Sequence, residues 1–319
     1  METALTRLVG CRVPLQQAGM GGTATAELVT AVADAGAIGM LGLAAVPAAA
    51  VAAIVERVAS ATSGVFGANF LIPFLDREAV AVAAAKARVV ELFYGDPDAS
   101  LVELVHSHGA LACWQVGSLR EALAAADAGC DLLVAQGNEA GGHVRGTVGL
   151  LPLLDQTLGA VDLPVIAAGG IGSARAFAAV LAAGAAGARI GTRFVAAEEA
   201  NTHQKYAEAL LAAEPEDTVV TTTFGAEWPD ATHRVLQSAV DAANATADDI
   251  VGQLHTSDGQ AVPLARLSVM PPGRTTTGAI EAMALYAGQS VGSVHSREPA
   301  AAIVRELADG AERLLGAWR

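Results

Sequence analysis

The chain has 319 residues, of which 53% are hydrophobic and only 4% aromatic, so a large core must be filled by Ala, Val, Leu and Ile. The net charge is −14 and no cluster of Lys or Arg offers a footprint for a phosphate backbone, which argues against nucleic acid as a partner. Cys11, Cys113 and Cys130 lack metal-ligand spacing and an even-numbered disulfide framework, so we expect no metal site and a reducing, cytoplasmic location.

One uncharged stretch could suggest a membrane span. Residues 35–55 carry no charge and are nominally long enough to cross a bilayer. They consist mostly of Ala and Gly, however, with Pro47 in their middle, and they divide into a strand and a helix. We therefore expect no membrane partner, and the start METALTRLVG has no long apolar segment of the kind found in signal peptides.

A repeating pattern of strand and helix runs from Arg12 to about Val195. Each cycle has an apolar run, a Gly-rich or polar link, and an Ala-rich helical stretch. The predicted strands are 13–17, 37–41, 65–71, 88–94, 110–116, 131–136, 164–168 and 188–191. The predicted helices that follow them are 25–36, 47–60, 76–87, 98–109, 118–129, 147–159, 173–184 and 192–200.

The eight cycles predict an α/β fold. The strands are continuously apolar rather than alternating, as expected when helices cover one face and a core fills the other. Repetition of strand and helix implies parallel strands joined by right-handed crossovers, and eight such units close a (β/α)8 TIM barrel. A doubly wound open sheet is the alternative, but it usually stops at about five to seven strands.

The pattern changes after about residue 200. We predict helices over 202–217, 232–244, 279–292 and 298–318, a strand over 219–224 and a loop over 263–278. The sequence therefore suggests a barrel over 1–200, a smaller appended α/β subdomain over 201–278, and C-terminal helices over 279–319 that return to the barrel.

The loop after the first strand, AGMGGTATA (18–26), is the first candidate site, because a barrel carries its functional groups on the loops that follow its strands. Gly19, Gly21 and Ala24 match the dinucleotide fingerprint G-x-G-x-x-A. That fingerprint needs an acid at the end of the next strand, and residues 40–45 contain none. A glycine-rich turn, or a backbone that approaches a flat ligand closely, remains as an interpretation.

Three further features point to the same end of the barrel. Asn69 is an amide within an apolar strand, where it either ties down a neighbouring loop or meets a polar edge of a ligand. AAGGIGSA (167–174) and IGTRF (190–194) follow the seventh and eighth strands, which is the habitual phosphate site of such barrels. Glycines that only allow close helix packing are the alternative for these two loops.

The loop QGNEAGGHVRG (136–146) follows the sixth strand and holds a histidine among glycines. Histidine titrates near neutrality and can exchange a proton with a substrate, while glycines give a flat ligand room to approach. We therefore predict that His143 is catalytic; a histidine that only satisfies loop carbonyls is the alternative. Glu139 has no assigned chemical role, and one interpretation is that it fixes the loop by accepting backbone N–H bonds.

The segments PLQQAGMGG, FGANFLIP, QGNEAGGHVRG, PVIAAGGIGSARA, IGTRF and YAGQSVG together resemble the nitronate monooxygenase family, formerly called 2-nitropropane dioxygenases. They also resemble its close relatives, the flavin-dependent enoyl-ACP reductases. The resemblance covers most of 12–200 and the stretch 285–292. It departs at Gly19, where many members carry a proline, and over 218–275, where no pattern aligns.

The resemblance implies FMN bound without a covalent link at the mouth of the barrel. By residue, it places Ala18, Gly19 and Met20 by the isoalloxazine, Asn69 and Gln136 near its polar edge, and Gly141 and Gly142 against it. It further implies a phosphate held by Gly169, Gly170, Gly191 and Thr192, with Gly288 and Gln289 closing over the cofactor from the returning helix. His143 matches the active-site histidine of the family.

The reaction implied by the resemblance is oxidation of an alkyl nitronate with O2 to a carbonyl compound and nitrite. His143 would orient the anionic nitronate or serve as base for a neutral nitroalkane. An NAD(P)H-dependent enoyl-thioester reductase and a flavin-free barrel that binds a phosphate-bearing ligand are the alternatives. The expected partners are a small-molecule substrate and O2, with a homodimer as a candidate assembly.

Overall fold

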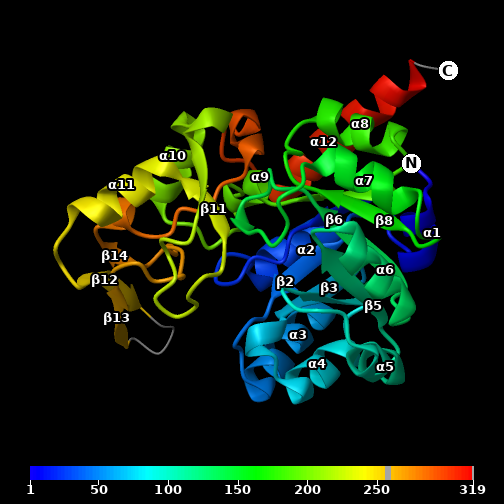
Figure 1. Cartoon of the computed structure of the whole chain (residues 1–319), viewed down its shortest axis with the longest axis horizontal. Helices are drawn as coiled ribbons and strands as arrows, with labels where there is room; N and C mark the ends of the chain where they lie inside the picture. Colours follow the sequence, from blue (N-terminus) through cyan, green and yellow to red (C-terminus); the bar gives the residue numbers. More distant parts are fainter. Residues whose placement is uncertain (256–259, 318–319) are drawn as a thin grey trace.

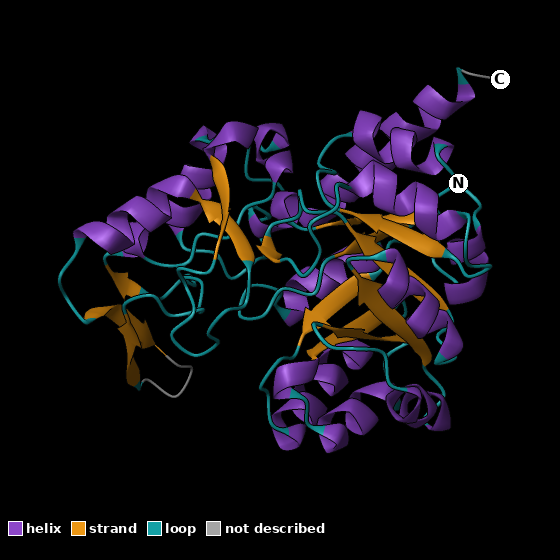
Figure 2. Ribbon diagram, in the orientation of Figure 1, coloured by secondary structure: helices purple, strands orange, loops and turns teal. Residues whose placement is uncertain are grey.

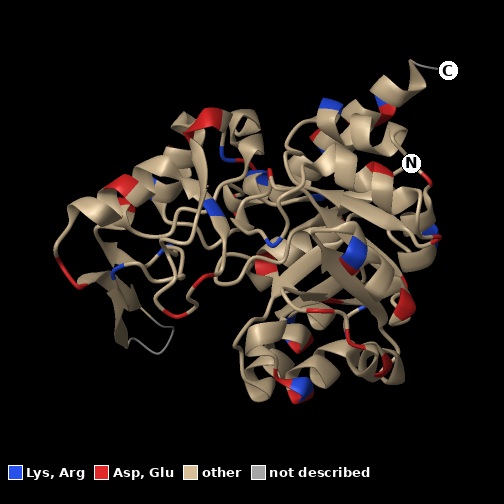
Figure 3. Ribbon diagram, viewed as in Figure 1, with Lys and Arg blue, Asp and Glu red and all other residues tan. Residues whose placement is uncertain are grey.

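The structure, a computed structural model, describes residues 1–255 and 260–317. Figure 1 shows a barrel that carries both chain termini and, beside it, a second lobe formed by the yellow-green to orange part of the chain. Helices surround the strands of the barrel, whereas the second lobe mixes helices, short strands and long connections (Figure 2). Acidic and basic residues are dispersed over both parts (Figure 3).

The predicted (β/α)8 barrel is confirmed. Within residues 1–255 and 260–317 its eight parallel strands are β1 (Leu15–Gln17), β2 (Gly39–Gly42), β3 (Phe66–Leu71), β4 (Val89–Phe93), β5 (Leu111–Val116), β6 (Leu132–Gln136), β8 (Val165–Ala168) and β9 (Gly187–Ile190). They pair in the order β1-β9-β8-β6-β5-β4-β3-β2. A parallel bridge between Gln16 and Ile38 joins the two ends of this order, so the ring closes.

Helices follow the strands as the alternating pattern predicts. They are α2 (Ala26–Asp34), α3 (Ala48–Ala61), α4 (Arg77–Ala84), α5 (Ala99–Ser107), α6 (Leu119–Asp127), α7 (Leu150–Leu158), α8 (Ala174–Ala182) and the short α9 (Thr192–Val195). Side chains such as Thr25, Ser118 and Ser173 accept N–H groups of the first helical turn. These caps fix where α2, α6 and α8 begin.

A short N-terminal helix, α1 (Ala4–Val9), contributes to the end of the barrel away from these links. Its Leu5 and Val9 are buried in one cluster with Ile38, Val89 and Leu132. The sequence did not indicate this helix, because six residues are too few to show helical periodicity. Since α1 packs at that end, the loops at the carboxyl ends of the strands are the part of the barrel that can receive a ligand.

The second lobe contains two helices and two small sheets among the described residues. The helices are α10 (Gln204–Ala212) and α11 (Gln237–Ala245). One sheet pairs β10 (Thr218–Thr221), β11 (His233–Leu236) and β7 (Gly142–His143), and the other pairs β13 (Ala261–Ala265), β12 (Ile250–His255) and β14 (Thr277–Gly278). The start of the predicted helix 232–244 is therefore a strand, and the ends of the predicted loop 263–278 lie in strands.

The stretch 279–292 also differs from its predicted helix. It forms two 3-10 turns, η3 (Ile280–Ala282) and η4 (Gln289–Ser293), joined by an extended connection. Tyr286 in that connection bridges to Val235, and the N–H of Leu236 donates to the carbonyl of Leu285 over 2.9 Å. Pairing with β11 thus replaces the hydrogen bonds of a helix in this buried segment.

The last helix, α12 (Ala300–Gly316), agrees with the prediction of a helical C-terminus that returns to the barrel. It packs against α8 and α2, as Figure 1 shows at the end of the chain. The exact division at residues 200 and 278 stays a prediction. In the described parts of the chain, no helix has both the length and the apolar character that crossing a bilayer requires.

Candidate active site

A cavity of about 680 Å³ lies at the carboxyl ends of the barrel strands, where the barrel meets the second lobe. It brings together most of the residues predicted from the sequence. These are Ala18, Gly19, Met20, Asn69, Gln136, Gly141, Gly142, His143, Gly169, Gly170, Gly191 and Thr192. The second lobe adds Tyr206, Glu227, Trp228, Val269, Met270, Pro271, Tyr286 and Ser290 to the lining.

Gly288 and Gln289 are the two predicted cofactor residues that are absent from the described lining. The N–H of Gly288 donates to the hydroxyl oxygen of Thr192 over 3.0 Å, and the N–H of Gln289 donates to the carbonyl of Glu139 over 2.9 Å. A Cβ on Gly141 would lie 2.4 Å from the backbone nitrogen of Gly288. These residues therefore hold two loops together, and Ser290 is the nearby residue that reaches the cavity.

Glycines leave room for a ligand on the side of the cavity nearest β8 and β9. Gly169 and Gly170 have φ values of +113° and +68°, a region that favours glycine. A Cβ on Gly191 would meet only the Cβ of Ala18, at 3.6 Å, and one on Gly142 would meet nothing within 4 Å. The bare backbone of these loops can therefore be approached closely, as the predicted phosphate and ring contacts require.

A buried polar network lies at the floor of the cavity, inside the barrel. The Asn69 amide donates to the Glu91 carboxylate over 2.8 Å. The Arg189 guanidinium donates to the same Glu91 oxygen and, over 2.5 Å, to the Gln115 amide oxygen. These four residues come from β3, β4, β5 and β9, so the network links opposite sides of the barrel. Arg189, Gln115 and Asn69 also line the cavity.

Sequence reasoning identified Asn69 but missed its partners. Glu91 in VVELF, Gln115 in LACWQV and Arg189 in GARI are polar residues within apolar strands, the same signal that identified Asn69. Applied to every strand, that signal would have found the whole network. Trp228 in the second lobe has no comparable local signal.

Gln136 offers a free acceptor to a ligand. Its amide nitrogen donates to the carbonyl of His143 over 3.0 Å, whereas its Oε1 is buried and has no hydrogen-bond partner among the described residues. Because an unpaired buried acceptor is costly, an N–H group of a ligand would stabilise it. Such a group is present on the polar edge of a flavin ring, so the residues present fit that cofactor.

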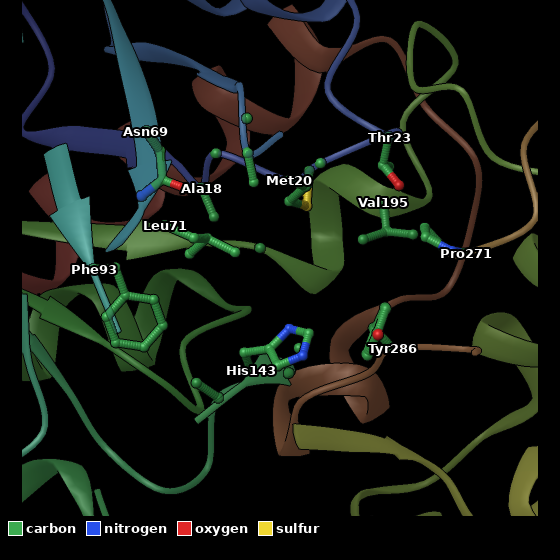
Figure 4. A pocket seen from close by; sticks show the side chains of 18 of the residues that line it. Ala18, Met20, Thr23, Asn69, Leu71, Phe93, His143, Val195, Pro271 and Tyr286 are labelled. Atoms are coloured by element: carbon green, nitrogen blue, oxygen red, sulfur yellow. The ribbon is translucent and has the colours of Figure 1, made fainter. Parts of the chain in front are cut away.

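His143 is held on β7, which is part of the barrel loop 136–146 and pairs with β11 of the second lobe. Its ring stacks on Trp228, with centroids 4.4 Å apart and an angle of 27° between planes. Tyr94 meets the imidazole edge-on at 5.9 Å, Tyr286 lies at 5.7 Å, and His233 at 5.4 Å. Figure 4 shows the imidazole pointing into the cavity, toward Tyr286.

The environment keeps the imidazole of His143 neutral. Burial, with a smaller contribution from His233, lowers its pKa to about 3. Its Nε2 is buried without a hydrogen-bond partner in the described residues. The neighbouring His233 differs, because its Nδ1 contacts the carbonyl of Ala231 at 2.8 Å and its Nε2 accepts from the N–H of Phe224. His143 is therefore the histidine with bonding capacity left for a ligand.

The role of Glu139 is now defined. Both of its carboxylate oxygens accept from the N–H of Leu150, at 2.9 and 3.0 Å. This bond caps the first turn of α7 and fixes the loop that carries His143, in agreement with the interpretation from the sequence. Arg234 holds the same loop from the other side, since its guanidinium donates to the carbonyl and the side-chain oxygen of Asn138.

Comparisons with solved structures relate both the barrel and the second lobe to known enzymes. FabK from Thermotoga maritima matches with a TM-score of 0.81 and 26% identity, covering 100% of this chain and 99% of that one. The nitroalkane oxidase from Streptomyces ansochromogenes matches with a TM-score of 0.80 and 26% identity, covering 99% of this chain and 100% of that one.

A comparison with curated proteins adds a third relative. It is the (3aS,4S,5R,7aS)-5-hydroxy-7a-methyl-1-oxo-octahydro-1H-indene-4-carboxyl-CoA dehydrogenase of Rhodococcus jostii, 35% identical over 229 residues. The match covers 69% of this chain and 62% of the relative, so the chain spans less than two thirds of that protein. The model of one family, described as nitronate monooxygenase, matches residues 2–81 and 74–310. The chain therefore belongs to the nitronate monooxygenase family and is an oxidoreductase.

Proposed function

We propose that the cavity binds FMN and that the enzyme oxidises alkyl nitronates with O2 to a carbonyl compound and nitrite. The family and its structural neighbours are flavoenzymes, which supports a flavin as the cofactor class. When bound, FMN supplies the electron chemistry: it takes electrons from the substrate and passes them to O2. The glycines around β8 and β9 would hold its phosphate, and Gln136 would accept from its ring N–H group.

One observation carries the choice of nitronate: His143, which lines the cavity, is neutral and has a buried ring nitrogen without a partner among the described residues. An imidazole with a pKa of about 3 is a poor base for a neutral nitroalkane, but at neutral pH it keeps one N–H to donate. A nitronate is already an anion and needs a donor rather than a base. His143 would therefore bind an oxygen of the nitro group and orient the adjacent carbon.

The surroundings of His143 exclude water from the reacting carbon. Trp228, Tyr94 and Tyr286 pack around the imidazole with ring centroids between 4.4 and 5.9 Å from it. An N–H···O⁻ bond to the nitronate is stronger in such an apolar environment than in water. The chain thus contributes binding, orientation and exclusion of water, while the redox step belongs to the cofactor.

An NAD(P)H-dependent enoyl-thioester reductase is the second candidate, favoured by the full-length similarity to FabK and by the CoA ester in the name of the Rhodococcus relative. The charged residues that line the cavity do not favour this reductase function. Among the described residues that line the cavity, Arg189 is the only Lys or Arg, and it already pairs with Glu91. A pyrophosphate-bearing coenzyme would therefore find no unpaired cation in this lining and would depend on backbone N–H groups, as proposed for the FMN phosphate.

The deciding experiment is an absorption spectrum of the purified protein, followed by anaerobic titration with ethylnitronate and then with NADPH. We expect a flavin spectrum that bleaches with nitronate alone and recovers when O2 is admitted, with release of nitrite. Bleaching by NADPH and not by nitronate would support the reductase instead. A colourless protein that cannot be reconstituted with FMN would favour a flavin-free barrel that binds a phosphate-bearing ligand.

A further inference from the structure

The lining of the cavity includes five apolar or aromatic side chains, which we call the apolar chamber: Leu71, Phe74, Phe93, Val46 and Trp228. The first four lie on loops or strand ends at the mouth of the barrel, and Trp228 belongs to the second lobe. Figure 4 shows the side chains of Leu71 and Phe93 pointing into the same space as His143. Because all five side chains are apolar or aromatic, this chamber suits a hydrocarbon substituent rather than a charged one.

Trp228 connects this chamber to the histidine. One face of its indole stacks on the imidazole of His143 at 4.4 Å. The indole also makes edge contacts with Tyr94, at 4.5 Å and 67°, and with Phe74, at 5.1 Å and 84°. The same side chain therefore touches both the group that faces the substrate and the wall of the apolar chamber.

The loop that carries Trp228 is fixed to its neighbour in the second lobe. The carboxylate of Glu227 accepts from the hydroxyl of Ser268 and from the N–H of Val269, both over 2.8 Å. The N–H of Ala226 donates to the carbonyl of Leu267 over 3.0 Å. These bonds fix the two residues that precede Trp228 and so help to set the position of the indole in the chamber.

Stacking also fixes what His143 can do. The indole face restricts rotation of the imidazole plane and covers one side of it, and Nε2 is buried without a hydrogen-bond partner among the described residues. A smaller side chain at position 228 would admit water beside the imidazole and allow it to turn. The pKa of His143 would then rise toward the ordinary value for histidine.

We infer that Trp228 is a positioning residue for His143 and the residue that limits the size of the substrate's apolar substituent. The substrate class is therefore a compact, uncharged alkyl or aryl group attached to the reacting anion. The identification of this anion as a nitronate rests on the proposed function. The role of Trp228 in limiting the chamber does not depend on that identification.

The test compares the wild type with Trp228→Ala and Trp228→Phe. Carboxylates resemble nitronates in shape and charge without reacting, so the dissociation constants of acetate, butyrate and hexanoate are measured by calorimetry. We expect Trp228→Ala to shift preference toward hexanoate by about tenfold relative to acetate, since it vacates space for several methylene groups. Trp228→Phe keeps an aromatic face and should stay within about threefold of the wild type. Leu151→Ala, which truncates an exposed apolar side chain on α7, is the matched control.

The positioning role has its own readout. The pH profile of kcat/KM with nitronates of the same chain lengths should be flat between about pH 5.5 and 8 in the wild type and in Trp228→Phe. In Trp228→Ala the profile should show a titration shifted toward the ordinary histidine pKa, because water would reach the imidazole of His143. Identical chain-length preference and pH profile in all variants would overturn the inference. If the wild type fails to oxidise any nitronate, the proposed function fails, and the carboxylate preferences still decide whether Trp228 sets the chamber.

Discussion

The buried pair of Glu91 and Arg189 gives the sharpest stability prediction. Glu91 is fully buried and the Arg189 side chain is only 8% exposed. Replacing Glu91 by Gln removes the charge that compensates the guanidinium but keeps the shape of the side chain. Breaking one partner of a buried ion pair costs about 3–5 kcal/mol. Since Gln115 would still accept from Arg189, we expect a loss at the lower end, about 3 kcal/mol of unfolding free energy.

Urea unfolding at pH 7, followed by circular dichroism, measures this loss. Glu56→Gln is the matched control, because Glu56 pairs with Lys86 on the surface with both side chains at least half exposed. That variant should change the unfolding free energy by less than about 0.5 kcal/mol. A second variant, Glu91→Gln with Arg189→Met, removes both charges and should recover part of the loss. A cost below about 1 kcal/mol for Glu91→Gln alone would refute the idea that Arg189 depends on this carboxylate.

Three further predictions concern the residues around the cavity. Folding lowers the pKa of His143 to about 3, so its contribution to stability is complete above about pH 6.5 and is lost as the pH falls toward 3. Between pH 7 and 5.5 the unfolding free energy should fall by about 1 kcal/mol less in His143→Asn than in the wild type, measured by urea titration at each pH. Gly191→Val fills space left for a ligand and should lower flavin retention on gel filtration, whereas Gly316→Val, with nothing within 4 Å of a Cβ, should not. Arg234→Ala removes charged hydrogen bonds to Asn138 and should cost about 2 kcal/mol of stability; an unchanged melting temperature would contradict this.

The barrel could be predicted because each of its strands and helices can be recognised from residues that are close in sequence. Each cycle shows its own apolar strand and Ala-rich or amphipathic helix, and the number of cycles determines the closed ring. The ring of strands places the loops that follow them at one end of the barrel. For this reason His143, Asn69 and glycines of 167–174 could be predicted to lie in the same cavity. By contrast, the segment 284–287 is extended although its composition favours a helix. Its conformation is set by pairing with β11. Because β11 lies elsewhere in the chain, the pattern of residues within the segment does not reveal this pairing.

Besides the partners of Asn69 in the barrel, the sequence did not predict the residues that the second lobe adds to the site. Trp228 and Tyr286 reach His143 from points about 85 and 143 positions further along the chain. Their proximity depends on how the lobe folds back on the barrel. Gly288 lies against Gly141 and Thr192, where the close approach of two loops needs glycine, and its contact with a cofactor stays a prediction.

The pairing of β7 with β11 limits how the second lobe of this enzyme can change. His143 belongs to the barrel by sequence, but its backbone is a strand of the second lobe's sheet, opposite His233. A lobe whose strand lay differently at the position of β11 would shift the pairing with β7 and with it the backbone of His143. Changes of substrate are therefore most easily reached by altering single side chains, such as Trp228, within the existing lobe. Exchange of the lobe as a unit would require the loop 136–146 to change with it.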